Sequence, residues 1–255
     1  MTPVLELQGA TIRFGGLVAV GDVSFSVNKG DLFGLLGPNG AGKTTCFNLI
    51  TGVYKPTSGS VLFQGQAIQG KAPHEICHLG VARTFQNIRL FSTMTALQNV
   101  MIGTLRGSKA GLGASLFWTP KAIRETKELR EKAMHLLEVM NLADDAHRMS
   151  TDLPYGKQRR LEIARAMATG PSLLLLDEPA AGMNPQESQE LMQTVRQIRD
   201  EFGMTVLLIE HDMRFVMNLC ERIVVLDHGE EIAYGGPDDI RNNPKVIEAY
   251  LGEAV

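Results

Sequence analysis

A glycine-rich loop between an apolar run and a helix-compatible run constrains this chain more than any other feature. Residues 37–45 read Gly-Pro-Asn-Gly-Ala-Gly-Lys-Thr-Thr, and Gly37 to Thr44 fit the pattern G-x-x-x-x-G-K-[ST]. The apolar run Leu32–Leu36 precedes the loop, and Thr44–Ile50 follows it. In this order of strand, loop and helix, backbone amides and a helix N-terminus can surround a polyphosphate. The sequence therefore predicts nucleotide binding.

The residues of the loop have separate predicted roles. The glycines let the backbone wrap the phosphate groups. Lys43 supplies a positive charge for the β- and γ-phosphates, and the hydroxyl of Thr44 is placed to bind Mg²⁺. A chance match has odds of about one in a hundred at ordinary composition. The predicted nucleotide-binding residues are Gly37, Pro38, Asn39, Gly40, Ala41, Gly42, Lys43, Thr44 and Thr45.

Composition and charge narrow the class of protein. The 255 residues are 44% hydrophobic and 21% charged, as in a soluble globular protein. The net charge of −3 gives no sign of a nucleic-acid partner. No apolar run is long enough to span a membrane, and the N-terminus lacks the pattern of a secretion signal. Three widely spaced cysteines, Cys46, Cys77 and Cys220, suggest reduced thiols and a cytoplasm-like compartment.

Alternating strand and helix patterns predict an α/β fold in a single domain, residues 1–255. Unbroken apolar strands, Leu173–Asp177 and Thr205–Ile209, indicate a buried, largely parallel sheet. Alternation near the N-terminus predicts further strands, with a hairpin turn at residues 57–59. The predicted division is 1–93 and 150–255 for the β and core subdomains and 94–149 for an inserted helical subdomain. The other predicted elements are strands Val4–Phe14 and Val23–Val27, a hairpin at Ile223–Tyr234, and helices Gly156–Ala168, Gln186–Glu201, from Asp212 and from Pro244.

Two carboxylates follow the apolar run Leu173–Leu176. Asp177 can orient Mg²⁺ or its water shell, and Glu178 is placed to polarise an attacking water. Many buried strands end in acidic residues, so this pair alone is a weak sign of a catalytic site. Together with the phosphate loop it is a strong one. Gln86 and His211 occupy the order expected of residues that contact a γ-phosphate, although a lone glutamine is usually on the surface and a lone histidine is usually structural.

These motifs together resemble the ATP-binding subunits of ABC transporters, over nearly all of the chain. The resemblance implies a P-loop ATPase core with a mostly parallel sheet, an antiparallel β subdomain and an inserted helical subdomain. In that family the residue matching Gln86 reads Mg²⁺ and the γ-phosphate, the one matching His211 contacts the γ-phosphate, and an aromatic matching Phe14 stacks on adenine. ATP and Mg²⁺ are the implied cofactors. The implied catalytic residues are Lys43, Gln86, Glu178 and His211, and the implied metal ligands are Thr44, Gln86 and Asp177.

The family signature, usually Leu-Ser-Gly-Gly-Gln, appears here as Leu-Pro-Tyr-Gly-Lys at residues 153–157. Pro154 replaces the serine whose hydroxyl would touch the γ-phosphate bound to the opposite subunit, and Asn184 stands where an aspartate is usual. These departures resemble the branched-chain amino acid importers, in which two different ATPase subunits pair. The implied nucleotide contacts from this segment are Leu153, Pro154, Tyr155 and Gly156. Further segments that resemble that subfamily are Arg13–Gly16, Arg83–Gln86, Arg89–Phe91 and Asn243–Gly252.

The resemblance implies an ATP-hydrolysing subunit at the cytoplasmic face of the inner (plasma) membrane. It would drive an importer, in the first place for branched-chain amino acids. The implied partners are a second ATPase subunit in a heterodimer, transmembrane permease subunits and, indirectly, a periplasmic or extracellular binding protein, with no nucleic acid. Two alternatives stay open: the ATPase of a related urea or short-amide importer, and a soluble ABC-type ATPase that acts in assembly or regulation without a transporter.

Two further patterns can be interpreted either as ordinary surface structure or as functional sites. His74, Glu75 and His78 match H-E-x-x-H, a zinc-protease motif, but no third ligand follows, so we predict a surface helix. Residues 76–124 hold six basic residues and no acidic one, and include the only tryptophan, Trp118. They are either a solvated basic face or a docking surface close to a membrane.

Overall fold

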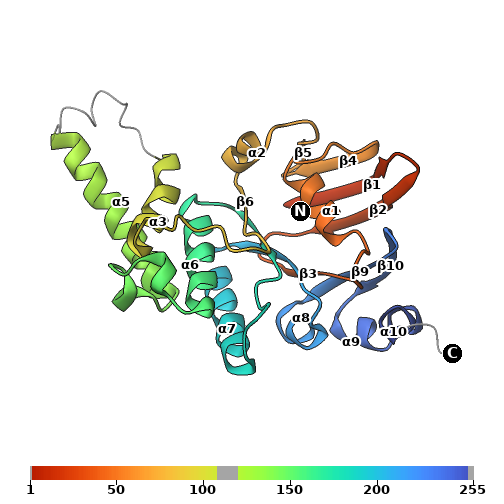
Figure 1. The fold of residues 1–255 in the computed structure, drawn as a ribbon. Coiled ribbons are helices and arrows are strands. Elements are labelled where there is room, and N and C mark those ends of the chain that lie inside the picture. Colours follow the sequence, from red (N-terminus) through yellow and green to blue (C-terminus); the bar gives the residue numbers. More distant parts are fainter. Residues whose placement is uncertain (1, 108–119, 252–255) are drawn as a thin grey trace.

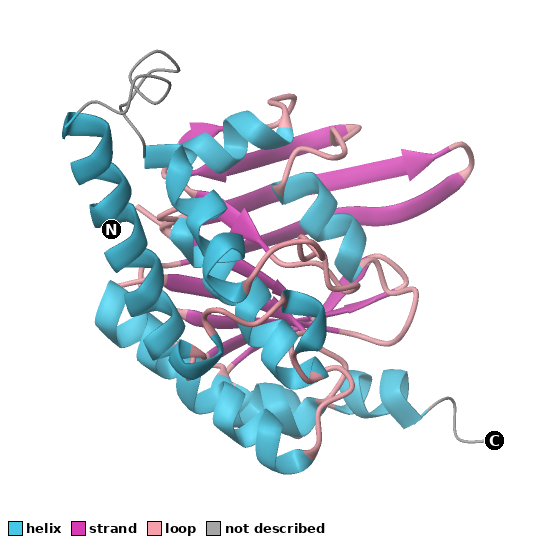
Figure 2. Cartoon of the chain, turned by 60° about the vertical axis from the view of Figure 1, so that its left-hand side comes forward, coloured by secondary structure: helices cyan, strands magenta, loops and turns pink. Residues whose placement is uncertain are grey.

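The fold consists of an antiparallel sheet, a mostly parallel sheet and a group of helices that extends away from both (Figure 1). The computed structural model describes residues 2–107 and 120–251. Figure 2 shows the helices gathered on one side of the strands, with one pair of long strands extending away from them. The predicted α/β fold is confirmed.

The antiparallel sheet has the strand order β2-β1-β4-β5. Its strands are β1 (Leu5–Phe14), β2 (Leu17–Val27), β4 (Ser58–Phe63) and β5 (Gln66–Ala67). The predicted turn at residues 57–59 is wrong. Gly59 instead lies within β4, where a Cβ atom would come within 2.1 Å of the carbonyl oxygen of Gly9 on β1. The glycine marks a close approach of two strands, and the turn follows at Gln64 and Gly65, which both have positive φ.

The second sheet has the order β10-β9-β3-β8-β7-β6. Its strands are β3 (Leu32–Leu36), β6 (Val81–Arg83), β7 (Leu173–Asp177), β8 (Thr205–Ile209), β9 (Arg222–Asp227) and β10 (Glu230–Gly235). All neighbours are parallel except β9 and β10. Every residue of β3, β7 and β8 is buried, which explains their unbroken apolar sequences.

The described helices are α1 (Lys43–Ile50), α2 (Pro73–Leu79), α3 (Ala96–Thr104), α5 (Pro120–Val139), α6 (Tyr155–Ala168), α7 (Pro185–Phe202), α8 (Met213–Leu219), α9 (Pro237–Arg241) and α10 (Pro244–Leu251), with short 3₁₀ turns η1 (Leu105–Gly107), η2 (Ala143–Asp145) and η3 (Ser150–Asp152). None of them combines the length and apolar character that a membrane crossing needs.

The two ends of the predicted helical insertion lie side by side. Thr95 and Met149 form an isolated β-bridge, and the N–H of Ala96 donates a 2.9 Å hydrogen bond to the carbonyl of Arg148. This pairing brings the two ends of residues 94–149 together, and the subdomain bounds stay a prediction. Helix α6 lies outside that range yet packs against both α3 and α5, so the helical layer also takes in the helix that follows the signature.

Candidate nucleotide-binding site

The sheet order brings four predicted segments to one edge. The carboxyl ends of the parallel strands β3, β6, β7 and β8 lie together, so the segments that follow them meet there. A cleft of about 470 Å³ opens at this edge. It is lined by Leu17, Val18, Ala19, Asn39, Gly40, Ala41, Gly42, Lys43, Thr44, Thr45, Gln86, Glu178 and His228.

The backbone of the phosphate loop depends on glycine at two points. A Cβ on Gly37 would lie 2.2 Å from the carbonyl oxygen of Leu226, and one on Gly42 would lie 2.6 Å from that of Ala19. Both glycines also have positive φ, 150° and 97°. The loop therefore packs so closely on neighbouring backbone that no larger residue fits.

Lys43 is oriented by its own loop. Its ammonium donates hydrogen bonds of 2.6 Å to the carbonyl of Gly37 and 2.8 Å to that of Pro38. Burial lowers the pKa of Lys43, while the charges of Glu178 and Asp177 raise it. An ammonium has three donors, so one remains for a phosphate oxygen.

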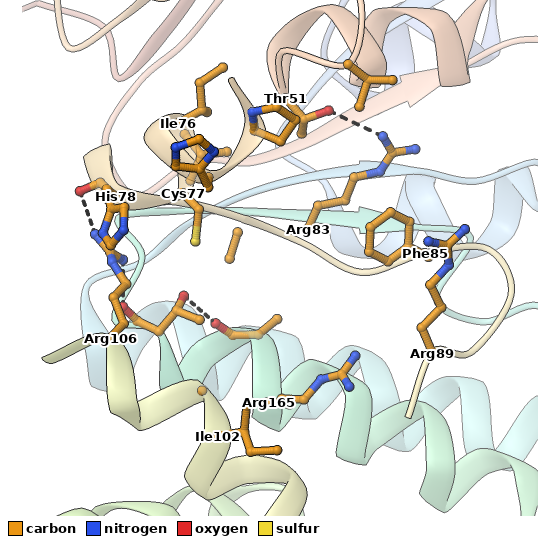
Figure 3. A pocket seen from close by; sticks show the side chains of 18 of the residues that line it. Thr51, Ile76, Cys77, His78, Arg83, Phe85, Arg89, Ile102, Arg106 and Arg165 are labelled. Carbon is orange, nitrogen blue, oxygen red and sulfur yellow. Dashed lines mark hydrogen bonds between the residues drawn. The ribbon is translucent and has the colours of Figure 1, made fainter. Parts of the chain in front are cut away.

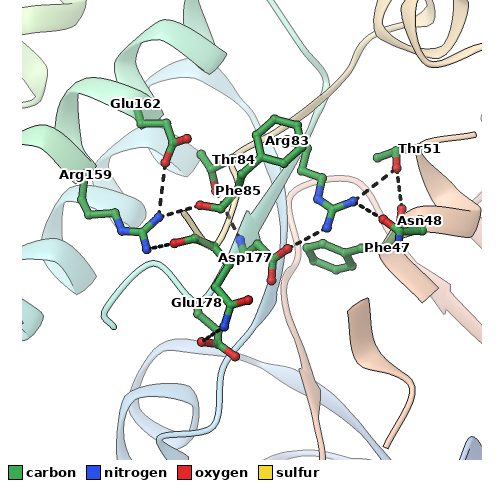
Figure 4. Close-up of polar contacts among 11 residues, drawn as sticks. Phe47, Asn48, Thr51, Arg83, Thr84, Phe85, Arg159, Glu162, Asp177 and Glu178 are labelled. Atoms are coloured by element: carbon green, nitrogen blue, oxygen red, sulfur yellow. Dashed lines mark hydrogen bonds and ion pairs between the residues drawn. The ribbon is translucent and has the colours of Figure 1, made fainter. Parts of the chain in front are cut away.

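Asp177 has a partner that the sequence analysis did not assign. The Asp177 side chain is buried, and its Oδ2 accepts a 2.7 Å bond from Nη2 of Arg83 (Figure 4). The other end of the same guanidinium donates to Oδ1 of Asn48 at 2.7 Å. Only the strand order could reveal this ion pair, because β6 lies next to β7 although Arg83 and Asp177 are 94 positions apart in the sequence.

Glu178, Gln86 and His211 lie close together. Nε2 of Gln86 donates to Oε2 of Glu178 at 3.0 Å, and Nδ1 of His211 lies 4.0 Å from the same oxygen. Glu210, which no motif indicated, lies beside them. It is buried, and it accepts a 2.8 Å bond from the N–H of Ala180. Burial raises the pKa of Glu210.

Phe14 lies apart from this group. It stands at the end of β1, 45% exposed, with its ring edge-on to Tyr54 at 5.1 Å between centroids. It is not among the described residues that line the cleft. Its stacking on adenine stays a prediction.

The signature segment occupies the entry to α6. Pro154 is the residue before the helix, with extended backbone, and Tyr155 is 45% exposed. The ring of Tyr155 lies against Gly182, where a Cβ would be 3.1 Å from it. Leu153 is buried. The signature segment thus packs on the loop that follows Glu178.

Gly156 and Asn184 meet at the start of α7. A Cβ on Gly156 would come within 3.0 Å of a carboxylate oxygen of Glu187. Oδ1 of Asn184 accepts from the N–H of Glu187 at 2.9 Å, and the Glu187 carboxylate accepts from the N–H of Asn184 at 3.0 Å. This reciprocal cap shows that asparagine fills the helix-capping role that an aspartate could also fill.

A buried arginine ties α6 to the segment that carries Gln86. Arg159 donates to the carbonyl oxygens of Phe85, at 2.6 Å, and Gln86, and to the carboxylate of Glu162 at 3.3 Å (Figure 4). Glu162 in turn accepts from the N–H of Arg89 at 3.2 Å. No sequence motif pointed to this network, because its backbone acceptors carry no residue-specific signal.

A groove of about 930 Å³ lies on the far side of this segment, between α2 and the helices α3 and α6 (Figure 3). Arg106 spans it, donating 2.6 Å bonds to the carbonyls of His78 and Thr169. The docking groove, as we call it, is lined by Thr51, Val53, Pro73, His74, Ile76, Cys77, His78, Val81, Ala82, Arg83, Phe85, Arg89, Leu90, Phe91, Ile102, Gly103, Arg106, Arg165, Ala166 and Thr169. Trp118 lies outside the described residues.

The H-E-x-x-H motif forms a short surface helix, as predicted. Helix α2 has seven residues, and His74, Glu75 and His78 are all exposed. Within residues 2–107 and 120–251 there is no group of three histidine, cysteine or acidic side chains that could hold a metal ion.

Comparison with known proteins finds two family profiles that match the chain. A family profile described as "ABC transporter" matches residues 20–181, and one described as "Branched-chain amino acid ATP-binding cassette transporter" matches residues 230–255. The chain is 50% identical over 252 residues to BraF of Pseudomonas aeruginosa, and 47% identical to LivG of Escherichia coli K12, each covering 99% of both chains. Both are described as high-affinity branched-chain amino acid transport ATP-binding proteins.

Solved structures agree with these sequence relatives. The ADP conformation of MJ1267, an ATP-binding cassette of an ABC transporter, superposes with a TM-score of 0.86 at 36% identity, covering 99% of this chain and 100% of that one. A dimeric post-hydrolysis cassette, MJ0796 with ADP and Pi, gives 0.77 at 25% identity, covering 91% and 98%. With a matching profile over most of its length and relatives aligned end to end, the chain belongs to the ABC transporter family of ATP-binding cassettes.

Proposed function

We propose that this chain is the ATP-hydrolysing subunit that powers import of branched-chain amino acids. The observation that carries the proposal is the Gln86–Glu178 hydrogen bond of 3.0 Å at the mouth of the cleft that the phosphate loop lines. We expect a carboxylate held at this place to polarise a water that attacks the γ-phosphate. The high identity to BraF and LivG over 252 residues supports the substrate class.

The chain's own residues divide the work at this site. Lys43 and the amides of the loop bind and orient the polyphosphate. Glu178 polarises the water, with Gln86 fixing its carboxylate and His211 contacting the γ-phosphate from the end of β8. Phe14 supports the adenine ring. The reaction is the hydrolysis of ATP to ADP and phosphate.

The residues present fit Mg²⁺. Three side chains near the loop offer oxygen ligands: the exposed hydroxyl of Thr44, the amide oxygen of Gln86, and Oδ1 of Asp177, which accepts no hydrogen bond among the described residues. Hard oxygen ligands combined with substrate phosphates suit this ion. When bound, Mg²⁺ would neutralise charge on the phosphates. Arg83 holds Oδ2 of Asp177 through their 2.7 Å ion pair, which leaves Oδ1 for the ion.

Replacing Glu178 by Gln tests the hydrolytic role. ATP binding should persist, because the loop is untouched, while turnover falls about 10²-fold or more, the scale of lost general-base assistance. The matched control is Glu131→Gln, which removes an exposed carboxylate on α5. Turnover of Glu178→Gln within twofold of wild type would contradict the assignment. Lys43→Ala should instead weaken the binding of ATP itself.

The docking groove supports a membrane-bound partner. Its lining is mostly apolar, and four arginines contribute to it: Arg83, Arg89, Arg106 and Arg165. We infer that a cytoplasmic loop of the permease subunits occupies it, which would hold this chain at the cytoplasmic face of the membrane. A periplasmic or extracellular binding protein would act only indirectly, through the permease.

Charge reversal separates docking from a merely solvated basic face. Arg89→Glu should reduce co-purification with the permease while the thermal stability of the isolated chain stays near wild type. The matched control is Arg124→Glu, whose side chain is 84% exposed on α5 and outside the groove. Equal assembly of both variants would favour the soluble-ATPase alternative. Uptake assays with leucine, urea and short amides would then separate the importer classes.

The pairing of subunits follows from the signature. Dimeric cassettes such as MJ0796 form the precedent, and we propose that this chain pairs with a second, different ATPase subunit. Pro154 offers neither a hydroxyl nor an N–H to a phosphate. The signature segment, Leu153–Gly156, would therefore serve the partner's ATP weakly. The stronger site would be the one built on Lys43 and Glu178.

A further inference from the structure

The C-terminal helix reaches the start of the phosphate loop through one side chain. The hydroxyl of Tyr250, on α10, accepts a 2.9 Å hydrogen bond from the backbone N–H of Gly37. The two residues are 213 positions apart, and Gly37 is the first residue of the loop. Nothing in the hydrolytic site described above gives α10 a role.

Gly37 depends on this acceptor because it is buried. It follows the last residue of β3, and its Cα faces the carbonyl of Leu226 so closely that only glycine fits. Water therefore has little access to its N–H. A buried N–H without an acceptor is strongly unfavourable, so the tyrosine hydroxyl fixes the place where strand ends and loop begins.

The other side of Gly37 holds the catalytic ammonium. Its carbonyl accepts the 2.6 Å bond from Lys43, next to the bond from Lys43 to Pro38. The backbone of Gly37 is thus hydrogen-bonded to Tyr250 through its N–H and to Lys43 through its carbonyl. Any displacement of this residue moves an oxygen that aims the lysine at the phosphates.

The helix that supplies Tyr250 is itself anchored. Val246, one turn earlier, is 1% exposed, while Ile247 and Leu251 are 45% and 81% exposed. Tyr250 is half-buried and packs against the main core. Helix α10 therefore packs with one face toward the core, and Tyr250 on that face contacts the phosphate loop.

We propose that Tyr250 is a positioning residue for nucleotide binding: its hydroxyl fixes Gly37, and through the Gly37 carbonyl it fixes the ammonium of Lys43. The proposal rests on the ATP binding proposed above. It gives the C-terminal helix a specific task, which is to hold the phosphate loop in the conformation that receives a nucleotide.

The test is Tyr250→Phe in the full chain, which removes the hydroxyl and keeps the ring. Loss of one neutral hydrogen bond should weaken ATP and ADP binding by about three- to tenfold, with kcat at saturating ATP within twofold of wild type. The matched control is Tyr234→Phe, because the Tyr234 hydroxyl makes no hydrogen bond within the described part of the chain. That variant should bind ATP as the wild type does.

A second measurement separates positioning from general stability. In a Lys43→Ala background, Tyr250→Phe should cause no further loss of affinity, because the side chain through which it acts is gone. Amide hydrogen exchange should show faster exchange at Gly37 in the nucleotide-free Tyr250→Phe variant, which needs no ATP at all. Unchanged affinity, or an undiminished effect without Lys43, would overturn the proposal. A wild-type chain that binds no ATP would refute the proposed function while leaving the exchange result to decide the Tyr250–Gly37 link.

Discussion

Replacing Arg159 by Met should destabilise the protein more than any exposed arginine substitution. Arg159 is 3% exposed and Glu162 is 2% exposed, so the carboxylate has almost no access to water. The substitution keeps an apolar stem but removes the arginine that pairs directly with Glu162, leaving it the N–H groups of Arg89 and Phe85 and the more distant charge of Arg165. It also removes the donor to the Phe85 and Gln86 carbonyls.

The magnitude follows from the buried charge. Removing one partner of a buried ion pair costs about 3–5 kcal/mol. In a chain of this size each kcal/mol lowers Tm by about 2–4 °C, so Tm should fall by roughly 6–20 °C. The matched control is Arg148→Met, because Arg148 pairs with Asp145 but its side chain is 52% exposed. Because Arg148 is exposed, Arg148→Met should lower the free energy of unfolding by less than about 1 kcal/mol.

The pH dependence identifies Glu162 as the cause. Burial raises the pKa of Glu162 above its ordinary 4.5, and Arg159 opposes this increase. Without Arg159 the pKa rises further, so the folded state holds the proton more tightly than the unfolded chain does. Stability is then lost as pH rises above the unfolded pKa, and the deficit of Arg159→Met should be larger at pH 8 than at pH 5.

Urea unfolding of the single and double variants at both pH values measures these effects. Adding Glu162→Gln to Arg159→Met should recover part of the loss, because a neutral amide replaces the unpaired carboxylate. A deficit below about 1 kcal/mol at pH 8, or an equal deficit at the two pH values, would refute the reasoning from a buried charge.

Three further predictions concern other parts of the site. Arg83→Met should destabilise the fold by about 3 kcal/mol or more, because Asp177 is buried and loses its counter-ion; urea unfolding measures this, and a loss below about 1 kcal/mol would contradict it. Pro154→Ser should raise hydrolysis at the partner's ATP site by roughly tenfold, the scale of one bond to a charged group, measured in the assembled pair with this chain's own site silenced by the glutamate substitution above. Gly42→Ala should weaken ATP binding by at least about tenfold, because a Cβ would lie 2.6 Å from the Ala19 carbonyl, and unchanged affinity by calorimetry would show that the loop can relax.

Much of the fold was accessible from the sequence because the signals were local. Strands Leu32–Leu36, Leu173–Asp177 and Thr205–Ile209 have the bounds that their apolar runs predict, and α10 begins at Pro244. The first half of β2 was missed because its run Leu17–Val20 does not alternate with polar residues, and Leu17 and Val18 are exposed although they are apolar. Periodicity reports burial, and an exposed hairpin arm buries little.

The candidate site also contains residues that local sequence patterns predict and others that they do not. Motif spacing predicted the residues of the loop and the two carboxylates, and the structure places the loop, Gln86 and Glu178 on one cleft. The partners of Asp177 and of the Gln86 carbonyl could not be predicted. Arg83 and Arg159 reach them across strand and helix contacts that depend on the order of elements in space. The roles of Phe14, His211 and the signature segment stay predictions.

The bonds of Lys43 to its own loop have a thermodynamic consequence. A free lysine side chain loses about 1.5–2 kcal/mol of rotamer entropy when it is immobilised. Here two carbonyls already immobilise it before any nucleotide arrives. That entropy loss belongs to folding rather than to binding, so calorimetry should find a smaller unfavourable entropy for ATP than a mobile lysine would cause. The ammonium of Lys43 is therefore already immobilised when the nucleotide binds.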